Sequence, residues 1–253
     1  MKKILLAIFS IMITFLLIQF VIPHYMTRDG LCIVGYHGVV SDEEKEIKYK
    51  DDIYTLSVSQ FERHMKYLYD EGYSTYNMDE VYDYKQGILE VDKKAVVLTF
   101  DDGYKNFNDV VKPILEKYQF KGTCFVIGKH LEDNKIRFLK EEDMINDQYV
   151  SYYSHSYDLH RKDKETNIKI IEELTLEEID QDFKKNKVDC TYFAFPYGKS
   201  RDDIKPILEK YGVKLAFSYS QYRHMSVKDD CYFLPRYMIV DYMPDIYFHW
   251  IVE

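Results

Sequence analysis

Four polar side chains in this sequence have the chemistry to hold and use a metal ion. Asp101 and Asp102 are adjacent and follow an apolar run, and His155 and His160 lie further along the chain. Adjacent acids repel each other and cost solvation free energy near a core, so a nearby cation would account for them. One carboxylate and two imidazoles make a three-ligand set with a fourth position open for water. The other carboxylate can act as a base on that water, which predicts metal-assisted hydrolysis.

The spacing of the two histidines predicts a loop, not a helix. His155 and His160 are five residues apart in SHSYDLHR, and helical zinc sites place their histidines at i and i+4. Gly103 lets the chain turn sharply just after the two acids. Each feature alone has a plain structural explanation, such as a helix cap, a core histidine or a turn. Their occurrence at successive strand ends favours a site.

The elements that would position these residues alternate along the chain. Strands are predicted at 31–37, 95–100, 123–128, 150–154, 191–195, 215–220 and 232–240. Helices are predicted at 57–72, 77–87, 108–118, 140–146, 175–187 and 202–212, with a solvated loop at 41–52. This alternation indicates an α/β fold with a parallel sheet, and six or seven such units suit a closed barrel. Barrel enzymes carry their chemistry at the C-terminal ends of the strands.

The polar residues occur at the predicted strand ends. If the strands are parallel neighbours, their ends converge on one rim. The residues brought there are His37, the pair Asp101 and Asp102, His155 with His160 nearby, the turn Pro196-Tyr197-Gly198, and Arg236 in the last strand.

Composition excludes some classes of function. The 253 residues carry a net charge of −9 and show no basic stripe, so we expect no nucleic-acid partner. The four cysteines include no CxxC pair, which disfavours a cysteine-based zinc site, and their even number permits a disulfide without requiring one. Cys32 and Cys124 lie in apolar runs and are predicted to be buried.

The first residues predict a membrane anchor. Lys2 and Lys3 precede an uncharged apolar run from Ile4 to Ile22, which at 1.5 Å per residue nearly spans a bilayer core of roughly 30 Å. We find no small-x-small cleavage site after it, so residues 1–23 are interpreted as a signal anchor with the remainder outside the cell. A cleaved secretory signal is the alternative. Residues 24–94 would form the N-terminal part of the barrel and 95–253 its core.

Several motifs carry a family resemblance. TFDDGY (99–104), SHSYDLH (154–160) and FAFPYG (193–198) resemble the first three motifs of the NodB-like polysaccharide deacetylases, carbohydrate esterase family 4. LPRYMI (234–239), with YHGV (36–39) upstream, is similar to the subgroup that includes the poly-N-acetylglucosamine deacetylases of biofilm matrix. The resemblance covers roughly residues 31–240.

The resemblance implies a distorted (β/α)7-type barrel and a divalent metal, most often zinc. It implies that Asp101 is the catalytic base and that Asp102, His155 and His160 are the metal ligands. Tyr197, next to Pro196 in the substrate-binding turn, matches the residue whose backbone N–H helps to hold the oxyanion. The five-residue histidine spacing is that of the poly-N-acetylglucosamine subgroup.

The sequence departs from the family at two catalytic positions. Phe193 stands where the third motif often has an arginine that pairs with the catalytic aspartate, and we expect Arg236 to replace it. No clear match exists for the histidine that acts as general acid. His37, His224 and His249 are the candidates, and His37 is favoured because it ends a strand.

The expected function is the metal-dependent removal of N-acetyl groups from an extracellular N-acetylglucosamine polysaccharide, with poly-β-1,6-N-acetylglucosamine favoured. The alternatives are deacetylation of peptidoglycan N-acetylglucosamine and, from another class, a catalytically weak membrane-tethered glycan-binding protein. A serine esterase is disfavoured because no G-x-S-x-G motif occurs. The expected partners are the polysaccharide and the membrane, and the sequence does not indicate a synthase or export partner.

Overall fold

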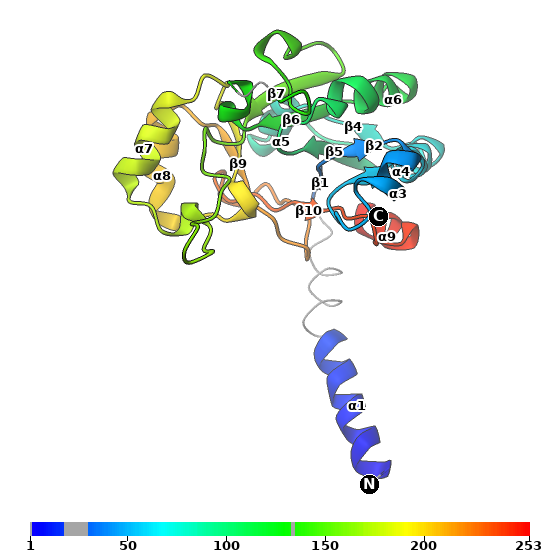
Figure 1. Ribbon diagram of the computed structural model, residues 1–253. Coiled ribbons are helices and arrows are strands. Elements are labelled where there is room, and N and C mark those ends of the chain that lie inside the picture. The colour runs from blue at the N-terminus through cyan, green and yellow to red at the C-terminus, as the bar shows by residue number, and fades with distance from the viewer. Residues whose placement is uncertain (1, 18–29, 133–134) are drawn as a thin grey trace.

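The structure is a computed structural model that describes residues 2–17, 30–132 and 135–253 (Figure 1). Its strands are β1 (Cys32–Tyr36), β2 (Val39–Val40), β3 (Leu56–Ser57), β4 (Ser74–Thr75), β5 (Ala95–Phe100), β6 (Gly122–Val126), β7 (Val150–Ser154), β8 (Tyr192–Ala194), β9 (Leu215–Phe217) and β10 (Tyr237–Met238). Its α-helices are α1 (Lys2–Leu16), α3 (Asp42–Ile47), α4 (Val58–Asp70), α5 (Met78–Lys85), α6 (Lys112–Tyr118), α7 (Leu176–Lys185), α8 (Lys205–Lys210) and α9 (Asp245–Val252). Shorter helical turns are η2 (Phe107–Val111), η3 (Gly128–Leu131), η4 (Glu141–Asp143), η5 (Ile170–Glu172), η6 (Pro196–Gly198) and η7 (Asp202–Ile204).

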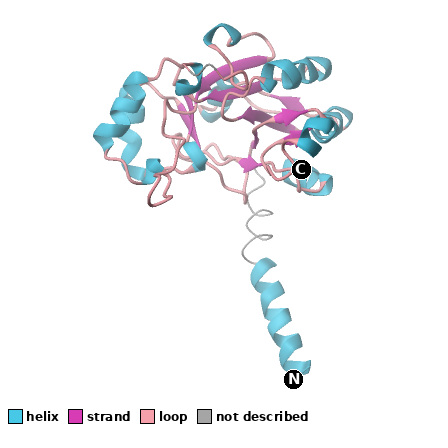
Figure 2. Cartoon of the chain, in the orientation of Figure 1, coloured by secondary structure: helices cyan, strands magenta, loops and turns pink. Residues whose placement is uncertain are grey.

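A parallel sheet forms the centre of the fold, and helices lie around its outside (Figure 2). Its strand order is β10-β1-β5-β6-β7-β8-β9, with β4 paired to β5. Residues 231–236 form backbone hydrogen bonds with residues 216–220 at β9, and β10, which follows directly, pairs with β1. The last segment of the chain therefore links the two ends of a curled sheet. This arrangement confirms the predicted α/β fold and fits a (β/α) barrel.

Local sequence accounts for the elements that support the site. Every residue of β5 is buried, as expected for a strand covered on both faces, and Thr99 is the one polar residue in its sequence AVVLTF. Helix α4 begins after Ser57, whose side chain accepts a hydrogen bond from Gln60 N. Helix α7 begins with a full capping box between Thr175 and Glu178. Buried apolar side chains of both helices pack toward the sheet, which holds the strand ends in place.

The structure differs from several of the secondary-structure predictions. The helix predicted at 140–146 is only the short turn η4. The stretch 41–52 contains helix α3, because the Ser41 side chain caps it and three acidic residues occupy its first turn. The strand predicted at 232–240 is reduced to β10, so Arg236 lies immediately before it. Helix α9 was not predicted, because its sequence DIYFHWIV is apolar on most sides and lacks a polar N-cap.

The predicted membrane anchor remains a prediction. Within the described residues, helix α1 has 15 residues, and no helix there is both long and apolar enough to cross a membrane. The second part of the apolar run, from residue 18 to Ile22, lies outside the described residues.

The four cysteines are free. Cys32 and Cys124 are buried, as predicted from the apolar runs that contain them. Burial raises the pKa of the Cys124 thiol well above its usual value, with a smaller contribution from the charges of Asp101 and Asp102, so this thiol is inert as a nucleophile.

Candidate active site

The C-terminal ends of the strands bring most of the predicted residues around one cavity of about 460 Å³, while Pro196 and Arg236 are buried behind its lining. Because neighbouring strands are parallel, the residues that follow them reach the same edge of the sheet. The side chains around this cavity include His37 after β1, Asp101 and Asp102 after β5, His155 and His160 after β7, Tyr197 after β8 and Tyr219 after β9. We refer to it as the active-site cavity.

Asp102, His155 and His160 form a group whose ligand atoms all lie within 4.8 Å of one another. The Oδ1 atom of Asp102 is 3.7 Å from His155 Nε2 and 3.6 Å from His160 Nε2. This Oδ1 is buried and has no hydrogen-bond partner among the residues that the structure describes. A buried carboxylate oxygen without a partner is costly, and a cation between it and two imidazoles would remove that cost. The three residues fit a divalent metal ion.

His155 is held in the form that a metal ligand requires. Its Nδ1 lies 2.7 Å from the carbonyl oxygen of Ala194, and because a carbonyl only accepts, Nδ1 carries the proton. The lone pair is then on Nε2, which faces Asp102. Burial lowers the pKa of His155 to about 4, although the charges of Asp101 and Asp102 act in the opposite direction. The imidazole is therefore neutral at physiological pH.

Asp101 is held by a buried arginine. The Arg236 guanidinium donates from Nη1 to Asp101 Oδ1 at 2.7 Å and from Nη2 to Oδ2 at 2.9 Å. Arg236 Nη1 also donates to Thr99 Oγ1 at 3.0 Å, which fixes the guanidinium from the β5 side. Arg236 is fully buried and lies directly before β10, whereas Phe193 lies in β8. The expected contact between Arg236 and Asp101 is therefore present.

A tyrosine and a glycine complete the surroundings of Asp101. The Tyr219 hydroxyl donates to Asp101 Oδ2 at 2.9 Å. Gly35 leaves room for that hydroxyl, since a Cβ at this position would lie 2.4 Å from it. Burial alone would raise the pKa of Asp101, but the charge of Arg236 and its hydrogen bonds hold that pKa well below its usual range. Asp101 is therefore ionised and keeps both oxygens oriented.

Of the three candidates for a general acid, His37 is the one at the active-site cavity. Its ring lies 5.2 Å from that of Tyr54, and its Nδ1 is buried without a hydrogen-bond partner in the described part of the chain. His224 Nε2 instead bonds to the carbonyl of Ile251, and His249 stacks on Tyr67. Neither of these lines the cavity.

Unusual backbone conformations cluster at the site. Asp102, Ser156 and Tyr197 all have positive φ angles, at 75°, 70° and 59°. Such conformations cost free energy in residues other than glycine and persist where the surrounding structure imposes them. Gly103 follows Asp102 with a φ of 72°, as predicted for a sharp turn. Tyr197 stacks on the ring of His160 at 4.0 Å, so the turn that follows β8 also packs on a metal-ligand candidate.

Helix α7 holds the loop between the two histidines from outside. Asp182 accepts hydrogen bonds from the backbone N–H groups of Tyr157 at 2.9 Å and Asp158 at 2.7 Å. One turn later, the Asn186 amide donates to Ser154 Oγ at 2.7 Å. Burial raises the pKa of Asp182 to about 6, and the two backbone donors act against that rise. These contacts explain how two histidines that are five residues apart come together without a helix.

Two of these residues were not predicted from the sequence. Tyr219 is one of 25 tyrosines, and nothing in its local pattern distinguishes it. Asp182 lies on an amphipathic helix, where an acidic residue is normally expected on the solvent-exposed face. The only usable signal was that an acidic residue falls on the apolar face of α7, between Ile179 and Phe183.

The sequence matches known proteins over much of its length. Residues 89–216 match the family described as "Polysaccharide deacetylase". The poly-beta-1,6-N-acetyl-D-glucosamine N-deacetylase of Staphylococcus aureus is 30% identical over 213 residues, which cover 78% of this chain and 70% of that protein.

Solved structures share the fold. IcaB from Ammonifex degensii has a TM-score of 0.72 at 23% identity and covers 89% of this chain and 98% of its own. A de-N-acetylase from Aggregatibacter actinomycetemcomitans has a TM-score of 0.69 at 22% identity and covers 85% of this chain and 96% of its own. At these identities the likeness concerns the fold.

Proposed function

The chain belongs to the polysaccharide deacetylase family, and we propose that it removes N-acetyl groups from poly-β-1,6-N-acetylglucosamine in a metal-dependent hydrolysis. The observation that carries this proposal is the active-site cavity, where three metal-ligating side chains face an arginine-held carboxylate. Its substrate is inferred from the relative in Staphylococcus aureus, whose name states that polymer.

Asp102, His155 and His160 would hold the metal, and zinc suits two imidazoles and one carboxylate. A divalent cation in this position supplies Lewis acidity for the acetamide carbonyl and lowers the pKa of water. The protein's own contribution is to keep His155 neutral through its bond to Ala194 and to leave Asp102 Oδ1 without a competing partner.

Asp101 acts as the general base. Its low pKa keeps it ionised, and the bidentate contact with Arg236 keeps it from turning toward Asp102. It takes a proton from the attacking water as the water oxygen adds to the acetamide carbon. The hydrogen bonds from Arg236 and Tyr219 orient the carboxylate before the substrate arrives.

Tyr197 and His37 complete the reaction. The backbone N–H of Tyr197, in the turn that begins with Pro196, stabilises the oxyanion of the tetrahedral intermediate. His37, on the β1 side of the cavity, donates a proton to the sugar nitrogen as the carbon–nitrogen bond breaks. The products are acetate and a glucosamine unit with a free amine.

We also propose that the catalytic part lies outside the cell and is anchored to the membrane. The uncharged run from Ile4 to Ile22 after two lysines supports a single-pass anchor with the catalytic part outside the cell. An extracellular position would give the enzyme access to a matrix polysaccharide.

The experiment that tests the function is acetate release by the full chain from poly-β-1,6-N-acetylglucosamine oligomers. We expect release that stops with a chelator and returns when zinc is added. The Asp101→Asn variant, purified in the same way, controls for contaminating esterases. Release that persists in the chelator would contradict the metal requirement. Release from peptidoglycan oligomers alone would contradict the proposed substrate.

A further inference from the structure

A second cavity of about 380 Å³ borders the active-site cavity. Tyr54 and Met238 line both, so the two spaces adjoin. Besides these two residues, its lining includes Ile53, Val240, Tyr242 and Tyr247. We call it the tyrosine cavity. Tyr242 is 73% exposed and Tyr54 43% exposed, so aromatic rings are accessible to a ligand from solvent.

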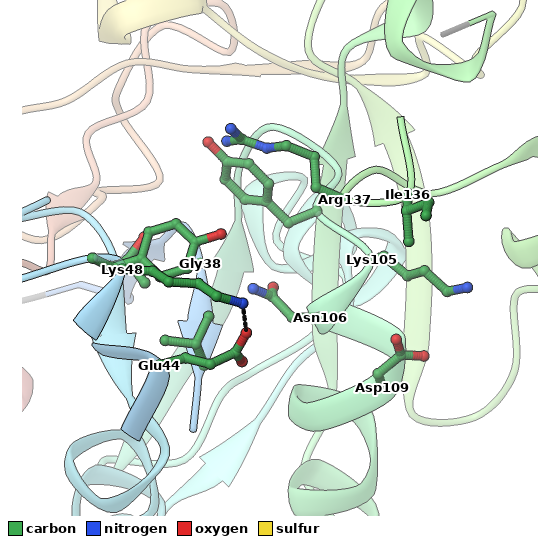
Figure 3. Close-up of a pocket in the computed structure, with 12 residues that line it drawn as sticks. Gly38, Glu44, Lys48, Lys105, Asn106, Asp109, Ile136 and Arg137 are labelled. Atoms are coloured by element: carbon green, nitrogen blue, oxygen red, sulfur yellow. Dashed lines mark hydrogen bonds and ion pairs between the residues drawn. The ribbon is translucent and has the colours of Figure 1, made fainter. Parts of the chain in front are cut away.

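The tyrosine cavity is uncharged, and this distinguishes it from a third cavity in the same region. None of the described residues that line it is acidic or basic. The third cavity, also of about 380 Å³, adjoins the active-site cavity through Thr55 and Tyr104. Five charged side chains line that space (Figure 3): Glu44, Lys48, Lys105, Asp109 and Arg137. The two neighbours of the active-site cavity therefore differ in the charge of the ligand that they can accept.

The wall of the tyrosine cavity is held in place without a ligand. Lys45 Nζ donates to the carbonyls of Tyr49 and Asp52, both at 2.8 Å, and pairs with Asp241 at 2.7 Å. Asp241 N also donates to the carbonyl of Ile53 at 2.9 Å. These bonds join the segment before Tyr54 to the segment before Tyr242. A preformed wall reduces the entropy that a ligand must lose on binding.

We propose that the tyrosine cavity is a subsite for the sugar ring next to the one being deacetylated, and that it selects a ring that still carries its N-acetyl group. This inference rests on the proposed function. An N-acetylglucosamine unit is uncharged and presents apolar ring faces that suit tyrosine rings. A glucosamine unit with a free amine is cationic at neutral pH, and the cavity offers its charge no carboxylate.

The experiment uses the full-length protein and compares substrates that differ in the number of sugar rings. Acetate release is measured from the methyl glycoside of N-acetylglucosamine, which has a single ring, and from a fully acetylated hexasaccharide of β-1,6-linked N-acetylglucosamine. For Tyr242→Ala we expect kcat/KM to fall about threefold to tenfold on the hexasaccharide, mainly through KM, and to stay unchanged on the single-ring substrate. The control is Tyr69→Ala, because Tyr69 is 58% exposed and lines neither the active-site cavity nor the tyrosine cavity.

Binding of partly deacetylated hexasaccharides tests whether the tyrosine cavity selects acetylated rings. Hexasaccharides in which about half of the units carry free amines should bind the wild type more weakly than acetylated ones, and Tyr242→Ala should reduce this difference. An equal loss of kcat/KM by Tyr242→Ala on the single-ring substrate and on the hexasaccharide, or no loss on the hexasaccharide, would contradict the proposed subsite. Absence of turnover by the wild type would overturn the proposed function instead. Hexasaccharide binding by calorimetry, compared between wild type and Tyr242→Ala, would then decide the subsite.

Discussion

Two buried histidines in this protein have nearly the same immediate geometry and different chemistry. His155 Nε2 lies 3.7 Å from Asp102 Oδ1, and His64 Nε2 lies 3.6 Å from Asp245 Oδ1. Burial lowers the pKa of each imidazole to about 4. Taken as a pair of residues, neither contact identifies a metal site.

The surroundings of the two histidines separate them. His155 has a second imidazole within the same group, and Asp102 keeps an unpartnered oxygen toward it. The ring of His64 stacks on Phe248 at 4.0 Å, and its Nδ1 lies 3.2 Å from the Tyr36 hydroxyl. His64 is packed as part of the core between α4 and α9.

The regions around His155 and His64 each contain an arginine–aspartate pair, and the two pairs differ in how far they are buried. Arg236 and Asp101 form a pair with side chains that are 0% and 1% exposed, whereas those of Arg63 and Asp245 are 56% and 35% exposed. An exposed pair contributes about 0–1 kcal/mol to stability. A buried charge must be compensated in full, so the inner pair fixes its carboxylate far more strictly. Both regions contain a carboxylate, an imidazole and a guanidinium. Of these two described regions, only the one around Asp102 also has a second imidazole in the same ligand group and a fully buried ion pair, and these two features make it a candidate metal site.

The largest difference in zinc content and turnover is expected between the alanine variants of His155 and His64. His155→Ala should lose zinc and reduce turnover about 10³-fold or more, because a metal contributes several kcal/mol to such reactions. His64→Ala should keep the zinc stoichiometry and most of the turnover per folded molecule, although it destabilises the fold. Metal analysis and acetate release on both variants check this. Equal zinc loss in the two variants would remove the distinction.

The next effect concerns the carboxylates. Asp101→Asn should reduce turnover by about 10²–10⁴-fold and retain zinc, since it removes a general base that is not in the ligand group. Asp245→Asn is the matched control and should change turnover little. Zinc content is measured beside acetate release. Substantial activity in Asp101→Asn would show that another group takes the proton from water.

Substitution of Arg236 tests whether its two hydrogen bonds are needed to orient Asp101. Arg236→Lys keeps the positive charge and loses the two parallel hydrogen bonds, so we expect turnover to fall about tenfold to 100-fold. The acid limb of the pH–rate profile should move to higher pH, because weaker pairing raises the pKa of Asp101. Arg63→Lys serves as the control. A profile that coincides with the wild type would rule out the holding role of Arg236.

A smaller effect is expected from the helix behind the histidine loop. Asp182→Asn should weaken zinc binding about tenfold to 100-fold, since it removes an acceptor for the Tyr157 and Asp158 N–H groups. Asp180→Asn is on the same helix and disturbs only an exposed pair with Lys210. Competition with a chromophoric chelator measures both affinities. Unchanged affinity in Asp182→Asn would mean that the loop holds its shape without α7.

The last effect lies outside the active site and is a pH dependence of stability at the core histidine His64. The pKa of His64 is lowered from 6.5 to about 4 by burial, against the opposing charge of Asp245. The unfolded chain therefore binds the proton first, and stability present above pH 6.5 is lost as pH falls toward 4. From pH 7.5 to 4.5 the loss should be roughly 2–3 kcal/mol. Urea unfolding of wild type and His64→Gln at both pH values measures it, and the same loss in both proteins would contradict the assignment.

Much of the site could be predicted because its signals are local. The acids follow one mostly apolar strand, AVVLTF, and the histidine pair follows a second strand, VSYYS. A strand pattern predicts where a chain turns back, and a parallel sheet places those turns at one edge. Helix caps at Ser57, Asn77 and Thr175 were likewise readable from residue type and spacing.

The sequence by itself determined most of the alternating strands and helices, the ligand types and the edge at which these ligands meet, since each depends on short-range periodicity and on residue chemistry. The tertiary structure decided which polar groups become partners. That Arg236 reaches Asp101 across 135 positions, that Tyr219 joins it, and that Asp182 holds the histidine loop depend on closure of the curled sheet. Such contacts leave no local pattern, because the free energy of a buried polar group depends on neighbours that only the folded chain supplies.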